Sequence, residues 1–230
     1  MKKGIFIVIE GSDGSGKGTH FNLLTEWLEE QGREIATYDF PQYDQPSSYF
    51  VREYLNGKYG GADELGAYKP SFFYALDRFD VSAKLRKDLA EGKLVICNRF
   101  TGSSMAHQGQ KLKGKERTAY FDWLFALEFD TLSIPKPDLN IVLIMPADIA
   151  QKLVDQKGER NYINKKRDIH EADINHLRGA VAAYQELCQR FPDTFTSINC
   201  TENNQLRAID EIQAAIRHCV NEKLLSLKNK

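Results

Sequence analysis

A glycine-rich loop with a single lysine occupies residues 10–19 and is the part of this chain best suited to chemistry. It reads Glu-Gly-Ser-Asp-Gly-Ser-Gly-Lys-Gly-Thr. Gly11 and Gly16 allow the backbone to turn sharply, so that backbone amides can converge on phosphate oxygens. Lys17 adds a positive charge that suits the β- and γ-phosphates of a nucleoside triphosphate. An ordinary glycine turn is the alternative, but the glycines, the lysine and the threonine together favour phosphate binding.

The segments on either side of this loop also fit a phosphate-binding P-loop. The apolar run at 5–9 predicts a buried strand, and the apolar spacing after the loop predicts a helix over 17–31. The N-terminus of that helix adds partial positive charge. Gly18 stands where a Ser or Thr often binds Mg²⁺, so Thr19 is the expected contact of this cofactor, through water. The predicted ATP-binding residues are Gly11, Ser12, Asp13, Gly14, Ser15, Gly16, Lys17, Gly18 and Thr19.

Apolar strand segments alternate with helical patterns along the chain. This alternation predicts an α/β fold of three layers, in which helices cover both faces of a five-stranded parallel sheet. Ligands bind such sheets at the carboxyl ends of the strands, so the P-loop and the segments after Asp39 and Asn98 should meet in one cleft. The strands are expected at 5–9, 34–38, 94–97, 139–145 and 194–199, and the helices at 17–31, 46–56, 70–91, 102–110, 115–132, 147–155, 168–190 and 204–226.

Two segments have the composition of mobile flaps. Residues 40–69 are rich in proline, glycine and tyrosine, and we expect them to bind the phosphate acceptor. Residues 155–168 are strongly basic, and we expect them to form a lid that closes over polyphosphate. A solvated charged loop is the alternative for the second segment, because most charge runs are exposed. The basic residues of this lid are Lys157, Arg160, Lys165, Lys166 and Arg167.

Two further segments carry side chains that can bind a phosphate acceptor. Tyr74 and Arg78 are four residues apart on a predicted helix, so a ring that can stack on a base lies beside a phosphate-binding guanidinium. The run from Arg99 to Gln108 follows the strand at 94–97 and offers a cation, hydroxyls and an amide for a base edge. A core stripe with one solvated arginine, and a polar loop with a serine N-cap, are the structural alternatives.

The composition excludes several classes of protein. With 31 basic and 32 acidic side chains the formal net charge is -1, so neither a nucleic-acid polymer nor an anionic membrane is an expected partner. The 4 cysteines have no paired spacing and indicate reduced thiols in a cytoplasmic protein. We expect no signal peptide and no membrane-spanning segment. The length of 230 residues indicates a single domain over residues 1–230.

In order along the chain, these motifs resemble those of the thymidylate kinase family, which are P-loop nucleoside monophosphate kinases. The strand and loop at 9–17 are similar to the start of that family, and 74–78 resembles its aromatic-x-x-x-Arg helix. The block at 99–109 resembles its Arg-aromatic…Ser-Ser-x-Ala-Tyr-Gln-Gly sequence. The resemblance spans nearly the whole chain, because further motifs of the family match at 40–43, 137–139, 168–171 and 184–187.

The resemblance implies transfer of the γ-phosphate of ATP to dTMP, which gives dTDP and ADP in dTTP biosynthesis. The attacking oxygen of a monophosphate is already anionic, so alignment and charge neutralisation carry such catalysis. The resemblance implies a homodimer, with the helix at 115–132 as a candidate surface and ordinary core packing as its alternative. The resemblance places Tyr74 on the base and both Arg78 and Arg99 on the acceptor phosphate. The implied catalytic residues are Lys17, Asp13, Arg99 and Arg160. The implied substrate-binding residues are Asp13, Phe40, Arg52, Tyr74, Arg78, Arg99, Ser104 and Gln108.

Three features depart from the family pattern. Asn98 stands where the family has an Asp near the metal, and His107 stands where it has a Tyr that helps exclude a ribose 2′-hydroxyl. The P-loop has no arginine between Asp13 and Lys17, so the lid would supply the catalytic cations. A kinase for another nucleoside monophosphate and a non-catalytic nucleotide-binding relative therefore remain alternatives. A regulatory P-loop switch is disfavoured, because the chain lacks an Asn-Lys-x-Asp motif.

Overall fold

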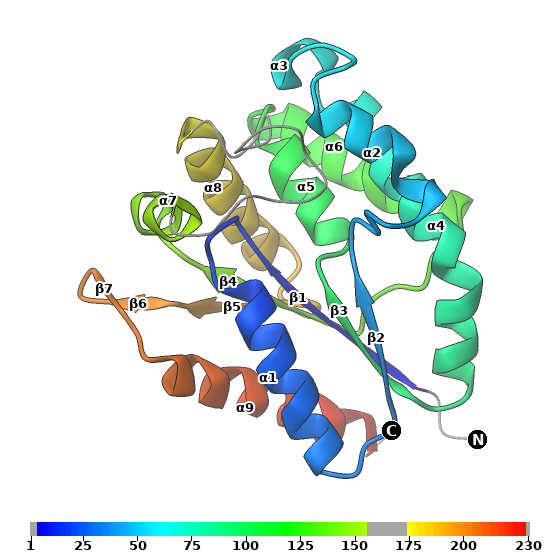
Figure 1. Ribbon diagram of the computed structural model, residues 1–230, viewed down its shortest axis with the longest axis vertical. Helices are drawn as coiled ribbons and strands as arrows, with labels where there is room; N and C mark the ends of the chain where they lie inside the picture. Colours follow the sequence, from blue (N-terminus) through cyan, green and yellow to red (C-terminus); the bar gives the residue numbers. More distant parts are fainter. Residues whose placement is uncertain (1–3, 156–173, 229–230) are drawn as a thin grey trace.

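A five-stranded sheet forms the centre of the molecule (Figure 1). The computed structural model describes residues 4–155 and 174–228. The strand order is β2-β3-β1-β4-β5, and every neighbouring pair is parallel. The predicted strands are confirmed, each within two residues at either end. They are β1 (Ile5–Gly11), β2 (Ile35–Asp39), β3 (Leu94–Asn98), β4 (Leu139–Ile144) and β5 (Phe195–Asn199).

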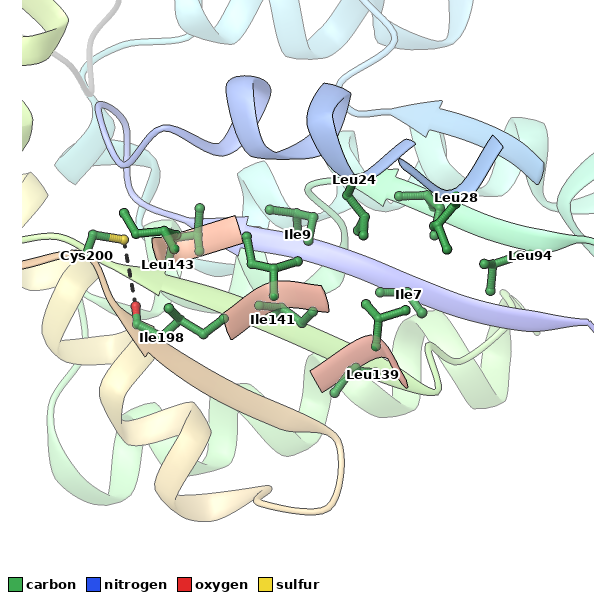
Figure 2. Packing of buried hydrophobic residues seen from close by; sticks show 14 of the residues in the cluster. Ile7, Ile9, Leu24, Leu28, Leu94, Leu139, Ile141, Leu143, Ile198 and Cys200 are labelled. Carbon is green, nitrogen blue, oxygen red and sulfur yellow. Dashed lines mark hydrogen bonds between the residues drawn. The ribbon is translucent and has the colours of Figure 1, made fainter. Parts of the chain in front are cut away.

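Successive side chains of β1 point to opposite faces of the sheet, and both faces are buried. Ile7 and Ile9 pack against one helical layer, while Phe6 and Val8 pack against the other. Figure 2 shows Ile7 and Ile9 in the first of these cores, together with Leu24 of α1 (Lys17–Glu30). The central strand, which ends in the P-loop, is therefore fixed from both sides.

The helices form a layer on each face, as the sequence predicts. α1 and α9 (Ile209–Lys228) cover one face, where their apolar side chains join the core shown in Figure 2. The other face is covered by α4 (Tyr68–Ala90), α5 (Thr101–Gly109), α6 (Gly114–Phe125) and α8 (Ile174–Arg190). α7 (Ala147–Asp155) ends where the predicted lid at 155–168 begins, and the rest of that lid lies outside the described residues.

The predicted acceptor segment is folded and largely helical. It contains a 3-10 turn, η1 (Pro46–Ser48), followed by α2 (Tyr49–Leu55) and the short α3 (Ala62–Leu65). The prediction of a helix at 46–56 is thus confirmed as η1 and α2. Val51, Tyr54 and Leu55 are buried in a small cluster of their own, which packs on aromatic side chains of α4. The segment therefore has its own core beside the sheet.

Two helix predictions were wrong in part. Residues 204–208 precede α9, and part of them belongs to a hairpin of β6 (Thr201–Glu202) and β7 (Gln205–Leu206). Asn203 and Asn204 form its turn with φ values of 49° and 60°, a left-handed geometry that asparagine tolerates better than most residues. The predicted helix at 115–132 is α6 followed by a π-helical segment, η2 (Ala126–Thr131). Within residues 4–155 and 174–228, no helix is long and apolar enough to cross a membrane.

Candidate active site

The predicted P-loop connects β1 to α1 as a tight turn. Gly11, Gly14 and Gly16 have φ values of 149°, 78° and 84°, which residues with side chains rarely adopt. Space is equally restricted, because a Cβ on Gly14 would lie 2.1 Å from the carbonyl oxygen of Ala150 in α7. Conformation therefore favours glycine at all three positions, and packing against backbone atoms requires it at Gly11 and Gly14 as well.

Polar groups of the P-loop suit a phosphate ligand. The Lys17 side chain is buried against the loop, and its Nζ donates to the carbonyl oxygen of Ser12 at 2.7 Å. The hydroxyls of Ser12 and Ser15 are buried and have no hydrogen-bond partner among the residues that the structure describes. Leaving a buried hydroxyl unpaired costs roughly 1–3 kcal/mol. Phosphate oxygens are acceptors that would satisfy both hydroxyls.

A cavity of about 320 Å³ lies beside the P-loop at the carboxyl ends of β2 and β3, where ligands of α/β sheets bind. Its volume is that of a small-molecule site. The structure brings most of the predicted acceptor residues together here. The predicted residues that line the cavity are Asp13, Phe40, Tyr74, Arg78, Arg99, Ser104 and Gln108.

Arg99 joins the cavity to the P-loop. Its guanidinium forms an ion pair with Asp13, and its Nη1 lies 3.4 Å from the carbonyl oxygen of Gly11. The backbone of Arg99 has φ 63°, a left-handed conformation that is unfavourable for a residue with a side chain. Such backbone strain persists only where the surroundings impose it, and it is concentrated at functional sites. Arg99 is thus held where a bound acceptor phosphate would face the P-loop.

Glu10 holds the start of α5 against the end of β1. The carboxylate is buried, and it accepts hydrogen bonds from the backbone N–H groups of Phe100 and Ser103 at 2.9 and 3.0 Å. It also accepts from the hydroxyls of Ser103 and Tyr184, at 2.6 and 2.9 Å. Burial raises the pKa of Glu10. These bonds pin the backbone on the C-terminal side of Arg99, so Glu10 helps to impose the strained conformation of that residue.

Arg78 forms a buried ion pair that the sequence patterns do not predict. Its Nε and Nη2 donate to the two carboxylate oxygens of Glu128 at 2.7 and 2.5 Å, and Nη2 also donates to Ser104 Oγ at 2.9 Å. Arg78 and Glu128 are 2% and 0% exposed, so the charge of Arg78 is matched inside the protein. Glu128 lies in η2, and short π-helical segments are frequent at functional sites. The two residues are 50 positions apart in the sequence, so no local sequence pattern predicts that they form a pair.

Asn98 pairs with a carboxylate that was not among the predicted site residues. Asn98 Nδ2 donates to Asp39 Oδ1 at 2.9 Å, across the adjacent ends of β3 and β2. Both residues line the cavity. The carboxylate that the family pattern places at position 98 thus has a counterpart on the neighbouring strand. Asp39 directly follows a predicted strand, and this position at the carboxyl end of a strand is the signal that could have identified it as a site residue.

Exchanging these two side chains tests how they depend on each other. Asn98→Asp would place a second carboxylate against Asp39 and remove the hydrogen-bond donor. Two neighbouring carboxylates repel each other, so we expect the pair to bind a proton more tightly in the folded than in the unfolded state. The free energy of unfolding of this variant should therefore fall as the pH rises from 5 to 8. We expect this fall to exceed any fall in the wild type by about 1–2 kcal/mol. Asp39→Asn combined with Asn98→Asp restores one donor and one carboxylate. Thermal melting across this pH range checks the prediction. If the stability of Asn98→Asp changes with pH as that of the wild type does, the prediction is wrong.

A chain of hydrogen bonds leads from Arg99 to α8. Arg99 Nη1 lies 3.3 Å from His107 Nε2, and His107 Nδ1 lies 3.1 Å from His176 Nε2. A guanidinium can only donate, so His107 accepts at Nε2 and, when neutral, carries its proton on Nδ1. Burial lowers the pKa of His107 well below its usual value, which agrees with a neutral ring. His176 then accepts from His107, and its Nδ1 lies 3.0 Å from the Gln110 amide.

Arg52 and Thr19 do not line the cavity. Arg52 is on α2, and its Nη1 donates to the carbonyl oxygens of Tyr43 and Gln45 at 2.6 and 3.1 Å, so it holds the loop before α2. Thr19 is exposed in the first turn of α1. Arg160 lies outside the described residues. Their functional roles stay predictions.

Oxygen donors near the P-loop fit Mg²⁺ only as partial ligands. Among residues 4–155 and 174–228, no group of three or more His, Cys, Asp and Glu side chains is placed to hold a metal ion. Mg²⁺ usually keeps several waters and takes one or two carboxylates together with substrate phosphates. Asp13 and Asp39 provide carboxylates at the cavity, and Thr19 provides a hydroxyl beside the P-loop. This donor set suits a metal that arrives with its nucleotide.

A P-loop that adjoins a cavity with two arginines, an aromatic ring and an amide defines a P-loop nucleoside monophosphate kinase, an enzyme that transfers a phosphoryl group. The family model described as "Thymidylate kinase" matches residues 9–212. The chain belongs to the thymidylate kinase family.

Individual relatives agree with this assignment. The chain is 30% identical to a thymidylate kinase of Caulobacter vibrioides over 226 residues, which is 97% of this chain and 99% of that protein. It is 28% identical to a probable thymidylate kinase of Pyrococcus horikoshii, over 98% of this chain and 100% of that one. A solved thymidylate kinase structure from Candida albicans superposes with a TM-score of 0.71 at 20% identity, over 96% of this chain and 93% of that chain. At that identity the structure supports the fold alone.

Proposed function

We propose that this chain transfers the γ-phosphate of ATP to dTMP, which yields dTDP and ADP for dTTP synthesis. The observation that carries this proposal is the cavity beside the P-loop, where Arg99 links the loop to a chamber lined by Tyr74 and Gln108. The membership of the thymidylate kinase family favours dTMP over another monophosphate. A non-catalytic relative is disfavoured, because the P-loop lysine and both cavity arginines are present.

The P-loop binds the donor nucleotide in this proposal. Residues 11–19 surround the ATP phosphates, and Lys17 leaves the carbonyl of Ser12 to neutralise the transferring group. Mg²⁺, bound with ATP, supplies further positive charge along the phosphates. Asp13 and Asp39 would hold its waters, together with Thr19. Arg160 of the predicted lid at 155–168 would close over the phosphates, and the segment at 40–69 would complete the acceptor side within the same domain.

The cavity binds the acceptor. Arg99 faces the P-loop and contacts the acceptor phosphate, whose anionic oxygen attacks without needing a general base. Tyr74 stacks on the base, and Phe40 supports it, while Ser104 and Gln108 contact its polar edge. Arg52 is a more distant phosphate contact.

Arg78 takes a different role from the phosphate contact that the sequence suggested. Glu128 already neutralises its charge through two hydrogen bonds, and Ser104 fixes its orientation. A neutralised, buried guanidinium still offers N–H donors but attracts a dianion weakly. We therefore assign Arg78 to a carbonyl group of the base, with the phosphate left to Arg99.

A coupled assay for diphosphate formation tests the proposed function. ATP and Mg²⁺ are supplied with dTMP, dUMP, UMP, CMP, GMP or AMP in separate reactions. We expect kcat/KM for dTMP to exceed that for each ribonucleotide by at least about 100-fold, since even a pocket without a specific hydrogen bond rejects an added hydroxyl by roughly that factor. Efficient use of a different monophosphate would retain the mechanism and reject dTMP as the substrate. ATP binding without transfer to any acceptor would reject the enzymatic function.

We also propose that the protein is a cytoplasmic homodimer. The helix at 115–132 is a poor candidate for the interface, because Tyr120, Phe121 and Leu124 are fully buried in the core. An exposed stripe on α4 is better suited to a second copy, and two of its rings contact Trp123, a half-buried residue of the 115–132 helix that adjoins this surface. The molar mass in solution checks the homodimer. The stripe comprises Tyr68, Phe72, Leu76 and Phe79, each between 41% and 47% exposed.

A further inference from the structure

Lys111 follows α5 and donates to oxygen atoms from separate segments of the chain. Its Nζ lies 2.7 Å from the carbonyl oxygen of Ala62 and 2.9 Å from that of Gly66, both beside the acceptor-side helix α3. It lies 2.8 Å from the side-chain oxygen Oε1 of Gln108, and 3.2 Å from the hydroxyl of Tyr54. An ammonium group has three N–H donors. These acceptors fix the ammonium in one position between α5 and the acceptor segment.

The position of Lys111 determines which way the amide of Gln108 faces. An ammonium cannot accept a hydrogen bond, so the amide atom next to it must be the oxygen. The hydroxyl of Tyr54, at 3.4 Å from the same oxygen, can donate to it as well. The amide nitrogen is the remaining polar atom of Gln108. It is buried and has no hydrogen-bond partner among the described residues, although Gln108 lines the cavity.

We propose that Lys111 is a specificity-determining residue, which fixes Gln108 so that the amide of Gln108 offers an N–H donor, and not an acceptor, to the acceptor base. This inference rests on the proposed function, because it concerns the monophosphate bound in the same cavity. In this proposal the donor faces position C4 of the base and needs a hydrogen-bond acceptor there. Thymine and uracil have a carbonyl at C4, whereas cytosine has an amino group there. A cytosine amino group would leave two donors facing each other inside a buried site, which is costly.

Lys111 does not touch the substrate in this proposal and acts through Gln108. Its bonds to Ala62 and Gly66 also hold the acceptor segment against α5, so removing it should loosen the binding of every monophosphate. Loosening alone would reduce the use of dTMP and dCMP by the same factor. The ratio of kcat/KM for dTMP to kcat/KM for dCMP therefore isolates the effect on Gln108 from the effect on the segment.

The test compares Lys111→Met with Lys111→Arg in the full-length protein. Methionine keeps an unbranched side chain but donates nothing, so the Gln108 amide becomes free to rotate and present its oxygen. We expect the dTMP-to-dCMP ratio to fall at least about tenfold in Lys111→Met, with KM for ATP unchanged. Arginine keeps the donors, so Lys111→Arg should stay within about threefold of the wild-type ratio. An unchanged ratio in Lys111→Met, with full folding by circular dichroism, would overturn the proposal and leave the kinase function intact.

A second variant keeps the test decisive if Lys111→Met fails to fold. Gln108→Glu has nearly the same shape, replaces the N–H donor with an acceptor and gains an ion pair with Lys111. We expect its dTMP-to-dCMP ratio to fall at least about tenfold. If the ratio of this variant equals that of the wild type, the amide donor of Gln108 does not select the base and the proposal is wrong. A wild-type protein that phosphorylates neither nucleotide would instead remove the proposed function on which the inference rests.

Discussion

Replacing Lys17 with methionine is expected to lower kcat by about three orders of magnitude or more. Lys17 is the cation of the P-loop, and the transferring phosphoryl group is stabilised mainly by charge and alignment. Methionine keeps the length of the side chain and fits a site that is 7% exposed. The backbone turn depends on the glycines around it, so the fold should survive. Steady-state kinetics with ATP and dTMP measure the loss, and thermal melting confirms that the protein is folded.

A matched control separates the P-loop charge from a general loss of basic residues. Lys115 is exposed at the start of α6, away from the cavity lining, so Lys115→Met should have wild-type kcat. Both variants lose one positive charge. A Lys17→Met protein that retains more than a tenth of wild-type kcat would contradict phosphoryl transfer at this P-loop.

Local sequence patterns predicted the P-loop and the strands because their physical causes are local. Gly11, Gly14 and Gly16 lie close together in the chain, and their positive φ values arise because one tight turn connects β1 to α1. The apolar run of β1 is buried on both faces, which is the pattern of a central parallel strand. The rule that ligands bind at the carboxyl ends of parallel strands predicted Arg99 at the ligand, and the family resemblance predicted Tyr74 on the base; both residues line the cavity.

The partners of these residues were not predictable, because they come from distant parts of the chain. Glu128, Asp39 and His176 reach the site only through the packing of η2, β2 and α8. The orientation of the Gln108 amide likewise depends on Lys111 and on the acceptor segment. The sequence left open whether the helix at 115–132 presents a dimer surface or packs into the core. Its aromatic residues are spaced for a helix, but periodicity alone does not distinguish a core-facing stripe from an exposed one.

The ion pair between Arg78 and Glu128 should produce the second large effect, on stability. Glu128→Met leaves a buried guanidinium without its counter-charge, and we expect the free energy of unfolding to fall by about 3–5 kcal/mol. Arg78→Met leaves the carboxylate of Glu128 unpaired and should have a similar cost. The double variant Arg78→Met with Glu128→Met buries no unpaired charge. We expect it to recover most of the lost stability, although Ser104 and Thr101 each lose a hydrogen-bond partner. Denaturant unfolding of the four proteins forms a double-mutant cycle.

The same double variant shows whether Arg78 serves the acceptor in addition to the fold. If Arg78 donates to the base, the stable double variant should still have KM for dTMP raised about tenfold or more, while KM for ATP is unchanged. If Arg78 is only structural, restored stability should restore both KM values together. Stability losses that simply add in the cycle would show that the two residues act independently. If Arg78 is neutralised by Glu128 and also donates to the base, the double variant should fold stably and still bind the acceptor poorly.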